Sequence, residues 1–257
     1  MSEVHRFRTS DNLSISYEDS GQGRAIVFIH GWAATRRFWS GQLADLSKRF
    51  RVVALDLRGH GDSDKNLEAD YTVDRMSNDL DELIRSLGLR DYVLVGHSMG
   101  GAIAVKHAAE RKGASSLVLT GVSTSIEGGL SLLSLEILMK FRGLAEKVVT
   151  PRMFAPGADE RLLEFVRRES AKSSVEVLMK VMRQVAGTDL KPLIGNVKIP
   201  ALVVAGERDS VAPSEQQKRL AQLLGARFVV LEGAGHNLML ERPSEFSRTI
   251  SEFASSY

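Results

Sequence analysis

The stretch LVGHSMGGAIAV, residues 94–105, places a serine between glycines where two sequence patterns meet. The apolar run before it, residues 92–95, is typical of a buried strand, and residues 102–109 carry apolar side chains at helical spacing. At such a junction the chain turns sharply, and glycines avoid collisions between Cβ atoms and the neighbouring backbone. The stretch therefore predicts that a turn between a strand and a helix exposes the hydroxyl of Ser98.

Strand-like and helix-like patterns alternate along most of the chain. Several strand-like runs are apolar at consecutive positions, which is typical of parallel strands buried on both faces. We expect strands at residues 13–17, 25–29, 52–55, 92–95, 117–120, 201–205 and 228–231, and helices at residues 72–87, 99–111, 214–224 and 243–254. This alternation predicts an α/β fold with a mostly parallel central sheet flanked by helices.

The alternation stops between Val122 and about Leu190, where no strand-like run occurs. Apolar residues at helical spacing occur there instead, at Leu130, Leu133, Ile137 and Phe141 and again at Val175, Leu178, Met182 and Val185. We expect residues 122–190 to form a helical lid inserted into a core made of residues 1–121 and 191–257. An insertion at this point lies over the carboxyl edge of the sheet, where open α/β sheets bind ligands.

The composition restricts the class of protein. A chain of 257 residues with 43% hydrophobic and 26% charged residues fits one globular domain with an insertion. The absence of cysteine excludes disulfides, thiolate zinc sites and a cysteine nucleophile. The net charge of +2 comes without long Lys/Arg blocks, so we expect no nucleic-acid partner. The sequence has no apolar leader and no 18-residue apolar stretch, which predicts a cytoplasmic protein without a membrane span.

A serine hydroxyl reacts at neutral pH only when a base within hydrogen-bond reach accepts its proton. The chain has six histidines. His236 lies in the segment GAGHN, residues 233–237, between the last strand-like run and the last helix-like run. It is therefore expected to emerge at the same edge of the sheet as Ser98, and we interpret it as the base.

The other five histidines are less suited to that role. His5 precedes the core strands, and His107 lies inside the helix after the serine, where it faces solvent or packs. His97 is adjacent to the serine and cannot turn back to it, which suits a position behind the base or in a pocket wall. His30 and His60 lie in turns that contain glycine, and we interpret them as structural hydrogen-bonding residues.

An imidazole base needs an acceptor that fixes its tautomer and stabilises its charged form. Asp209, in GERDSVAP at residues 206–213, follows the strand at 201–205 and is our candidate. Glu207 comes too early in the same turn, and Asp56 follows an earlier strand and is expected to brace the RGHG loop, residues 58–61. The strand at 117–120 ends in TGVS and offers no carboxylate.

Main-chain amides complete the candidate site. The segment HGW, residues 30–32, follows the strand at 25–29. The N–H of Trp32, together with the N–H of Met99 at the start of the helix, is expected to bind a developing negative charge. Each of these loops taken alone also fits an ordinary turn. Four such loops at one edge of the sheet favour the catalytic interpretation.

The motifs together resemble the α/β-hydrolase superfamily, in its branch of small lidded serine esterases. They are HGW at 30–32, RGHGDSD at 58–64, GHSMGG at 96–101, GERDSVAP at 206–213 and GAGHNLMLERP at 233–243, and the likeness covers nearly the whole chain except the lid. The sequence is similar to pimeloyl-acyl-carrier-protein methyl ester esterases, enol-lactonases and cofactor-free haloperoxidase-type esterases, which share these motifs. The order Ser98, Asp209, His236 is that of the superfamily. Dehalogenases and epoxide hydrolases of the superfamily carry Asp at the elbow, so Ser98 argues against alkyl-enzyme chemistry.

This resemblance and the residues predict a serine hydrolase that cleaves carboxylic esters through an acyl-enzyme. In this interpretation Ser98 attacks the acyl carbon, His236 transfers the proton, Asp209 orients His236, and the amides of Trp32 and Met99 hold the oxyanion. No cofactor is expected, because the sequence has no P-loop, no HExxH motif and no cluster of metal ligands. An acyltransferase or a perhydrolase using the same acyl-enzyme, and a ligand receptor with a hydrolase fold, stay open as alternatives.

The lid segment carries an excess of basic residues. Residues 140–191 contain eleven Lys/Arg and seven Asp/Glu, and Arg152, Arg161, Arg167 and Arg168 are candidates for steering an anionic substrate or an acyl carrier. A solvated helix face with ion pairs is the interpretation that we favour. The apolar residues 130–144 fit both lid packing and the wall of an acyl pocket.

Overall fold

The computed structural model describes residues 3–125 and 149–257 of the chain. The helix that we expect around Leu130, Leu133, Ile137 and Phe141, and the apolar segment 130–144, lie outside these residues. An eight-stranded sheet runs in the order β1-β2-β4-β3-β5-β6-β7-β8. The pairs β1/β2 and β2/β4 are antiparallel, and the other pairs are parallel. The strands are β1 (Val4–Arg8), β2 (Ser14–Ser20), β3 (Ala25–Ile29), β4 (Arg51–Leu55), β5 (Tyr92–His97), β6 (Ala114–Thr120), β7 (Ala201–Gly206) and β8 (Arg227–Leu231).

Each of the seven predicted strands falls on an observed strand, whereas β1 is not among the predictions. Strand β1 has the sequence VHRFR and alternates exposed with partly buried side chains. It pairs only with β2, at the edge of the sheet. An edge strand with one neighbour and a half-exposed face lacks the continuous apolar run by which the buried strands are found. Its pairing depends on β2 rather than on a local sequence signal.

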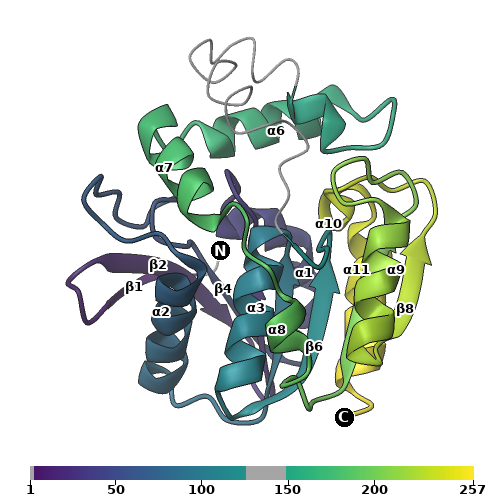
Figure 1. Ribbon diagram of the computed structural model, residues 1–257, viewed down its shortest axis with the longest axis horizontal. Helices are drawn as coiled ribbons and strands as arrows, with labels where there is room; N and C mark the ends of the chain where they lie inside the picture. Colours follow the sequence, from purple (N-terminus) through teal and green to yellow (C-terminus); the bar gives the residue numbers. More distant parts are fainter. Residues whose placement is uncertain (1–2, 126–148) are drawn as a thin grey trace.

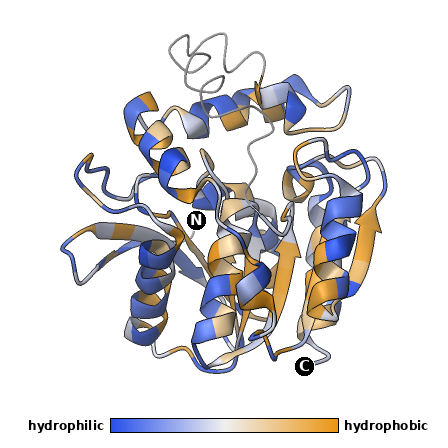
Figure 2. Ribbon diagram, in the orientation of Figure 1, coloured by the Kyte–Doolittle hydropathy of each residue, from blue (hydrophilic) through white to orange (hydrophobic). Residues whose placement is uncertain are grey.

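Helices cover both faces of the sheet because successive side chains of a strand point to opposite faces. In β5, Tyr92 and Leu94 belong to one apolar cluster, while Val93 and Val95 belong to the other. The first cluster is covered by α2 (Val73–Ser86), α3 (Met99–Glu110), α8 (Lys191–Ile194) and α9 (Ser214–Leu224), and the second by η1 (Arg36–Trp39), α1 (Ser40–Leu46), α10 (Leu238–Glu241) and α11 (Pro243–Ala254). Figure 2 shows this layering, with β6 and β8 largely apolar and α2 largely hydrophilic.

Two further helices, α6 (Glu160–Ser170) and α7 (Val175–Val185), lie above the end of the sheet to which the arrows of β6 and β8 point (Figure 1). The apolar spacing in residues 175–185 predicts α7 correctly, and its Val177 and Val181 join the first core cluster. Helix α6 is not among the predicted elements, and its Leu163 and Val166 join the second cluster. The described part of residues 122–190 therefore packs against both halves of the core.

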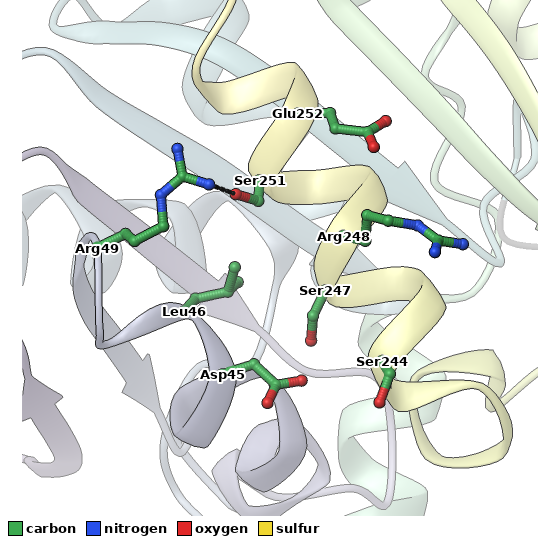
Figure 3. Close-up of a pocket in the computed structure, with 8 residues that line it drawn as sticks. All are labelled: Asp45, Leu46, Arg49, Ser244, Ser247, Arg248, Ser251 and Glu252. Atoms are coloured by element: carbon green, nitrogen blue, oxygen red, sulfur yellow. Dashed lines mark hydrogen bonds between the residues drawn. The ribbon is translucent and has the colours of Figure 1, made fainter.

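An open groove of about 360 Å³ lies on the outer side of α1 and α11 (Figure 3). It is lined by Asp45, Leu46, Arg49, Ser244, Ser247, Arg248, Ser251 and Glu252. None of these residues belongs to the elements that carry the candidate catalytic side chains. None of the helices that the structure describes combines the length and the apolar character that crossing a membrane requires.

Candidate active site

Ser98 occupies the turn between β5 and α3, with φ 52° and ψ −121°. A positive φ costs a residue other than glycine about 1–3 kcal/mol, so the surrounding structure must hold it. The N–H of Ser98 donates to the oxygen of Thr120 at 2.9 Å, and its own oxygen accepts from the N–H of Gly101 at 2.8 Å. A Cβ at Gly100 would overlap main-chain oxygens at the end of β3 and just after it. The predicted strand-to-helix turn is therefore present, and it is enforced by the backbone.

His236 and Asp209 are buried and lie in direct contact. The Nδ1 of His236 lies 2.9 Å from Oδ2 of Asp209 and 3.1 Å from its Oδ1. The carboxylate also accepts from the N–H groups of Val211 and Ala212, each at 2.9 Å, and from Nε2 of Gln217 at 3.1 Å. Because a carboxylate only accepts, Nδ1 of the imidazole carries the proton in this pair, and Nε2 is left free to act as an acceptor.

The backbone around the end of β6 brings His236 next to Ser98. A Cβ at Gly121 would lie 2.7 Å from Cε1 of His236, and Gly121 directly follows Thr120, the residue that binds the amide of Ser98. The ring of His97 lies 4.6 Å from that of His236, centre to centre, and its Nε2 lies 3.1 Å from the main-chain oxygen of His236. Within the described residues, Ser98 and His236 form no direct hydrogen bond with each other.

The loop after β3 packs against the same turn. A Cβ at Gly31 would lie 3.1 Å from Cβ of Ser98. In the part of the chain that the structure describes, no hydrogen bond uses the main-chain N–H of Trp32 or that of Met99. The indole of Trp32 donates to the main-chain oxygen of Leu178 in α7 at 2.8 Å. Both candidate oxyanion donors therefore keep an unused N–H beside Ser98.

His30 and His60 are fully buried and bound within their own turns. His30 uses Nδ1 on the oxygen of Gly31 at 2.7 Å and Nε2 on the N–H of Leu57 at 3.0 Å. His60 uses Nδ1 on the oxygen of Arg58 at 3.0 Å. Burial lowers the pKa of His30 to about 4 and that of His60 to about 3. Both histidines are neutral and structural, as the sequence predicts.

The remaining histidines also lie where they cannot serve as the base. His107 is buried, with Nε2 at 2.8 Å from the hydroxyl of Tyr92, so it packs rather than faces solvent. Burial lowers its pKa to about 4. Burial, reinforced by the nearby His236, lowers the pKa of His97 well below its ordinary value. His5 lies on β1, away from the turn.

The rival carboxylates have other partners. Glu207 accepts from the N–H of Gly233 at 2.9 Å. Asp56 is buried, forms an ion pair with Arg36 and accepts from the N–H of Asp62 at 2.8 Å, while burial raises its pKa. It therefore braces the loop at residues 58–64, as expected. Of the three carboxylates that the sequence offers, Asp209 is the one that the structure places on His236.

Two polar residues near the site are missing from the predictions. Glu241 accepts from the N–H of Gly235 through Oε1 and from the N–H of Ala155 through Oε2, each at 2.9 Å, and burial raises its pKa. Gln217 binds Asp209, as described above. Its sequence signal is its helical phase, because it shares a face of α9 with the buried Leu220 and Ala221.

The basic residues of the lid segment differ in their surroundings. Arg167 pairs with Glu160 at 2.6 Å, and the guanidinium of Arg168 lies 5.6 Å from the ring centre of Phe165. The side chains of Arg152 and Arg161 are exposed. These contacts fit the solvated helix face that we favour, and contact with an acyl carrier stays a prediction.

Comparison with known proteins places the chain. A model of the alpha/beta hydrolase family matches residues 26–249. The chain belongs to this family. As an α/β hydrolase it is similar to a non-heme haloperoxidase of Rhodococcus erythropolis, with 31% identity over 255 residues that cover 89% of this chain and 91% of the relative.

Solved structures of related hydrolases superpose over nearly the whole chain. An esterase from Exiguobacterium antarcticum has a TM-score of 0.91 and 25% identity, covering 98% of this chain and 100% of its own. The enol-lactonase from Burkholderia xenovorans LB400 has a TM-score of 0.90 and 27% identity, with the same coverage. The esterase, enol-lactonase and haloperoxidase relatives confirm the resemblance to the branch of small hydrolases that the motifs indicate. They support hydrolysis of esters in general.

Proposed function

We propose that this α/β hydrolase is a serine esterase that cleaves small or medium carboxylic esters through an acyl-enzyme. Ser98 Oγ attacks the acyl carbon while His236 accepts the hydroxyl proton and then passes it to the leaving alkoxide. Asp209 keeps the imidazole in the required tautomer, and the amides of Trp32 and Met99 bind the oxyanion. Water, deprotonated by His236, then attacks the acyl-enzyme and releases the acid and Ser98.

The buried contact between Asp209 and His236 carries this proposal. It holds the proton on Nδ1, so Nε2 can accept the proton of Ser98. Ser98 and His236 flank the end of β6 without a direct hydrogen bond. This separation agrees with the proposal, because catalytic hydrogen bonds of a free enzyme are often long and tighten when substrate binds.

We further propose that residues 122–190 form a lid over a core of residues 1–121 and 191–257. Helices α6 and α7 lie over the carboxyl end of the sheet (Figure 1), and α7 contacts Trp32. The lid then supplies the walls of the acyl pocket. Deleting the lid helices while keeping the sheet is expected to leave short-ester activity and to change the chain-length preference. An unchanged preference would show that other residues form the pocket.

The experiment is steady-state hydrolysis of a p-nitrophenyl ester series, starting with acetate and butyrate, combined with fluorophosphonate labelling. The wild type is expected to turn over and to be labelled once, at Ser98. Ser98→Ala is expected to lose labelling and more than about a thousandfold in kcat. Ser86→Ala, an exposed serine at the end of α2, is the control and keeps both. Labelling at another residue, or full activity in Ser98→Ala, would refute the proposal.

Perhydrolysis is a second candidate, favoured by the haloperoxidase relative. The same acyl-enzyme attacked by hydrogen peroxide gives a peracid, which oxidises halide, so no cofactor is needed. Halogenation in acetate and peroxide, lost in Ser98→Ala, tests it. Product analysis with a competing alcohol tests acyl transfer in the same way, and steady turnover of the esters argues against a receptor that only binds.

A further inference from the structure

Gln217 is a fully buried amide side chain of α9 with three hydrogen-bond partners on two loops. Its Nε2 donates to Oδ2 of Asp209 at 3.1 Å and to the oxygen of Ala212 at 2.7 Å. Its Oε1 accepts from the N–H of Gly121 at 2.9 Å. The first two partners only accept and the third only donates, so a single orientation of the amide satisfies all three.

The partners of Gln217 are the groups that fix the imidazole of His236. Asp209 binds its Nδ1, and Gly121 supports its ring, because a Cβ there would lie 2.7 Å from Cε1 and 3.0 Å from Nδ1. Gly121 has a φ of 64°, so its backbone conformation is one that needs support. Through the adjacent Thr120, the same strand end holds the amide of Ser98. One side chain therefore connects the acid, the support of the base and the strand end beside the nucleophile.

We propose that Gln217 is a positioning residue that holds Asp209 and Gly121 in register, so that the imidazole of His236 lies at a fixed place beside Ser98. This inference rests on the proposed function. Gln217 contacts no reacting atom, and its effect passes through the two groups that it binds. The donation to Oδ2 also shares the negative charge of Asp209, which moderates the attraction of that carboxylate for a protonated imidazole.

Gln217→Met tests the proposal, because methionine has a similar length and forms none of the three hydrogen bonds. We expect kcat to fall about 10- to 100-fold, the loss expected for a hydrogen bond to a charged group, with KM within about twofold. Without the Gln217 donor the full charge of Asp209 acts on the imidazole, so the acid limb of the kcat/KM profile moves to higher pH. The other titratable groups that face this pair are His97 and Glu241, which the variant leaves in place.

Two controls separate positioning from stability. Gln216→Met alters the preceding, exposed residue of the same helix and is expected to keep the wild-type kcat and acid limb. Rates are referred to the sites titrated by the fluorophosphonate, so unfolded protein does not count. A Gln217→Met enzyme with lower thermal stability but with wild-type kcat per titrated site and an unmoved acid limb would overturn the proposal.

Gln217→Glu gives a second test with a different signature. The new carboxyl keeps an acceptor for Gly121 but faces Oδ2 of Asp209, so two carboxyl groups share one position and hold one proton between them. While that proton is bound, the carboxyl donates to Asp209 as the amide does. When it leaves at higher pH, repulsion displaces Asp209. We expect activity to fall at alkaline pH in this variant and not in wild type, and a profile of wild-type shape would refute the proposal.

The Nδ1 proton of His236 gives a readout that does not depend on esterolysis. In wild type it is expected as a downfield imidazole resonance in the proton NMR spectrum, and in Gln217→Met we expect it to shift upfield or broaden. If the wild type hydrolyses no ester but the resonance changes in Gln217→Met, the proposed function fails and the positioning role stands. If esters are hydrolysed and the resonance is identical in both proteins, the positioning role fails alone.

Discussion

The indole Nε1 of Trp32 donates a hydrogen bond to the main-chain oxygen of Leu178, 2.8 Å away, so the loop after β3 is joined to α7. The same contact region includes Met179 and Met182, which pack with the Trp32 side chain in a small apolar cluster. The residue whose main-chain N–H is the proposed oxyanion donor is thus also an anchor of the proposed lid. Its two roles use different atoms and are separable by substitution.

Trp32→Phe removes the indole donor and keeps both the main-chain N–H and an aromatic ring. We expect α7 to be bound less firmly by about 1 kcal/mol, the net contribution of a buried hydrogen bond, so its amides exchange roughly fivefold faster. Hydrolysis of p-nitrophenyl acetate is expected to stay within about threefold of wild type, since the oxyanion donors are unchanged. Hydrogen exchange of residues 175–185 measures the effect.

Trp39 provides the matched control for that substitution. It is the other tryptophan of the chain and is fully buried, and among the described residues its Nε1 has no hydrogen-bond partner. Trp39→Phe therefore removes no hydrogen bond, and we expect the exchange of α7 to stay at the wild-type rate. Equal acceleration in both variants would show that the indole of Trp32 is not what holds the lid.

The acid loop offers two carboxylates, and exchanging each for its amide distinguishes them. Asp209→Asn presents an N–H₂ or a neutral oxygen to His236 and no longer fixes the proton on Nδ1, so we expect kcat to fall by about 10³- to 10⁴-fold. Glu207→Gln changes the residue two positions earlier, whose carboxylate binds Gly233 instead, and is expected to keep kcat within about twofold. A larger loss in Glu207→Gln than in Asp209→Asn would move the acid to Glu207.

The sequence predicts best those elements whose signal is local. Strand β3, AIVFI, is buried at all five positions, and its apolar run alone marks it as a central strand. The turn at Ser98 is found because glycines at fixed positions reflect a close backbone approach. The order of the strands in space, with β4 between β2 and β3, has no such local signal, since it depends on crossovers of the chain.

The residues missed near the site have the same explanation. In the segment SEQQKR, nothing but helical phase distinguishes the exposed Gln216 from the buried Gln217. The role of Gln217 depends on Gly121, which is 96 residues away in the chain. Glu241 binds the amides of Gly235 and Ala155, and the second lies in the lid segment, so only the folded chain brings them together.

Glu241→Gln tests the link between the loop of His236 and the segment before α6. Both carboxylate oxygens accept from main-chain N–H groups, whereas an amide must turn its N–H₂ toward one of them. We expect a loss of about 1–3 kcal/mol in the free energy of unfolding, as for a buried donor left without its acceptor. Urea denaturation measures it. Glu232→Gln, an exposed residue of the same connection, is expected to leave the unfolding midpoint unchanged.

The neutral buried histidines make stability depend on pH. Burial lowers the pKa of His30 and His107 to about 4, that of His60 to about 3 and that of His97 well below 6.5. In the unfolded chain these imidazoles take up protons below pH 6.5 or so, whereas in the folded chain they do not. The free energy of unfolding is therefore fully present above this pH and falls as the pH drops toward the lowered values, by up to about 1.4 kcal/mol per pH unit for each histidine.

The variant His107→Gln isolates one of these contributions. Urea unfolding at pH 7, 6 and 5.5 is expected to show a smaller loss of stability with falling pH than in wild type, by about one proton in the linkage slope at the acid end. This range lies above the region where Asp56 and Glu241, whose pKa values burial raises, oppose the trend most strongly. His5→Gln, on the edge strand β1, is expected to keep the wild-type slope. Equal slopes in wild type and His107→Gln would mean that His107 is protonated in the folded chain, which its contact with Tyr92 in a buried, low-dielectric site opposes.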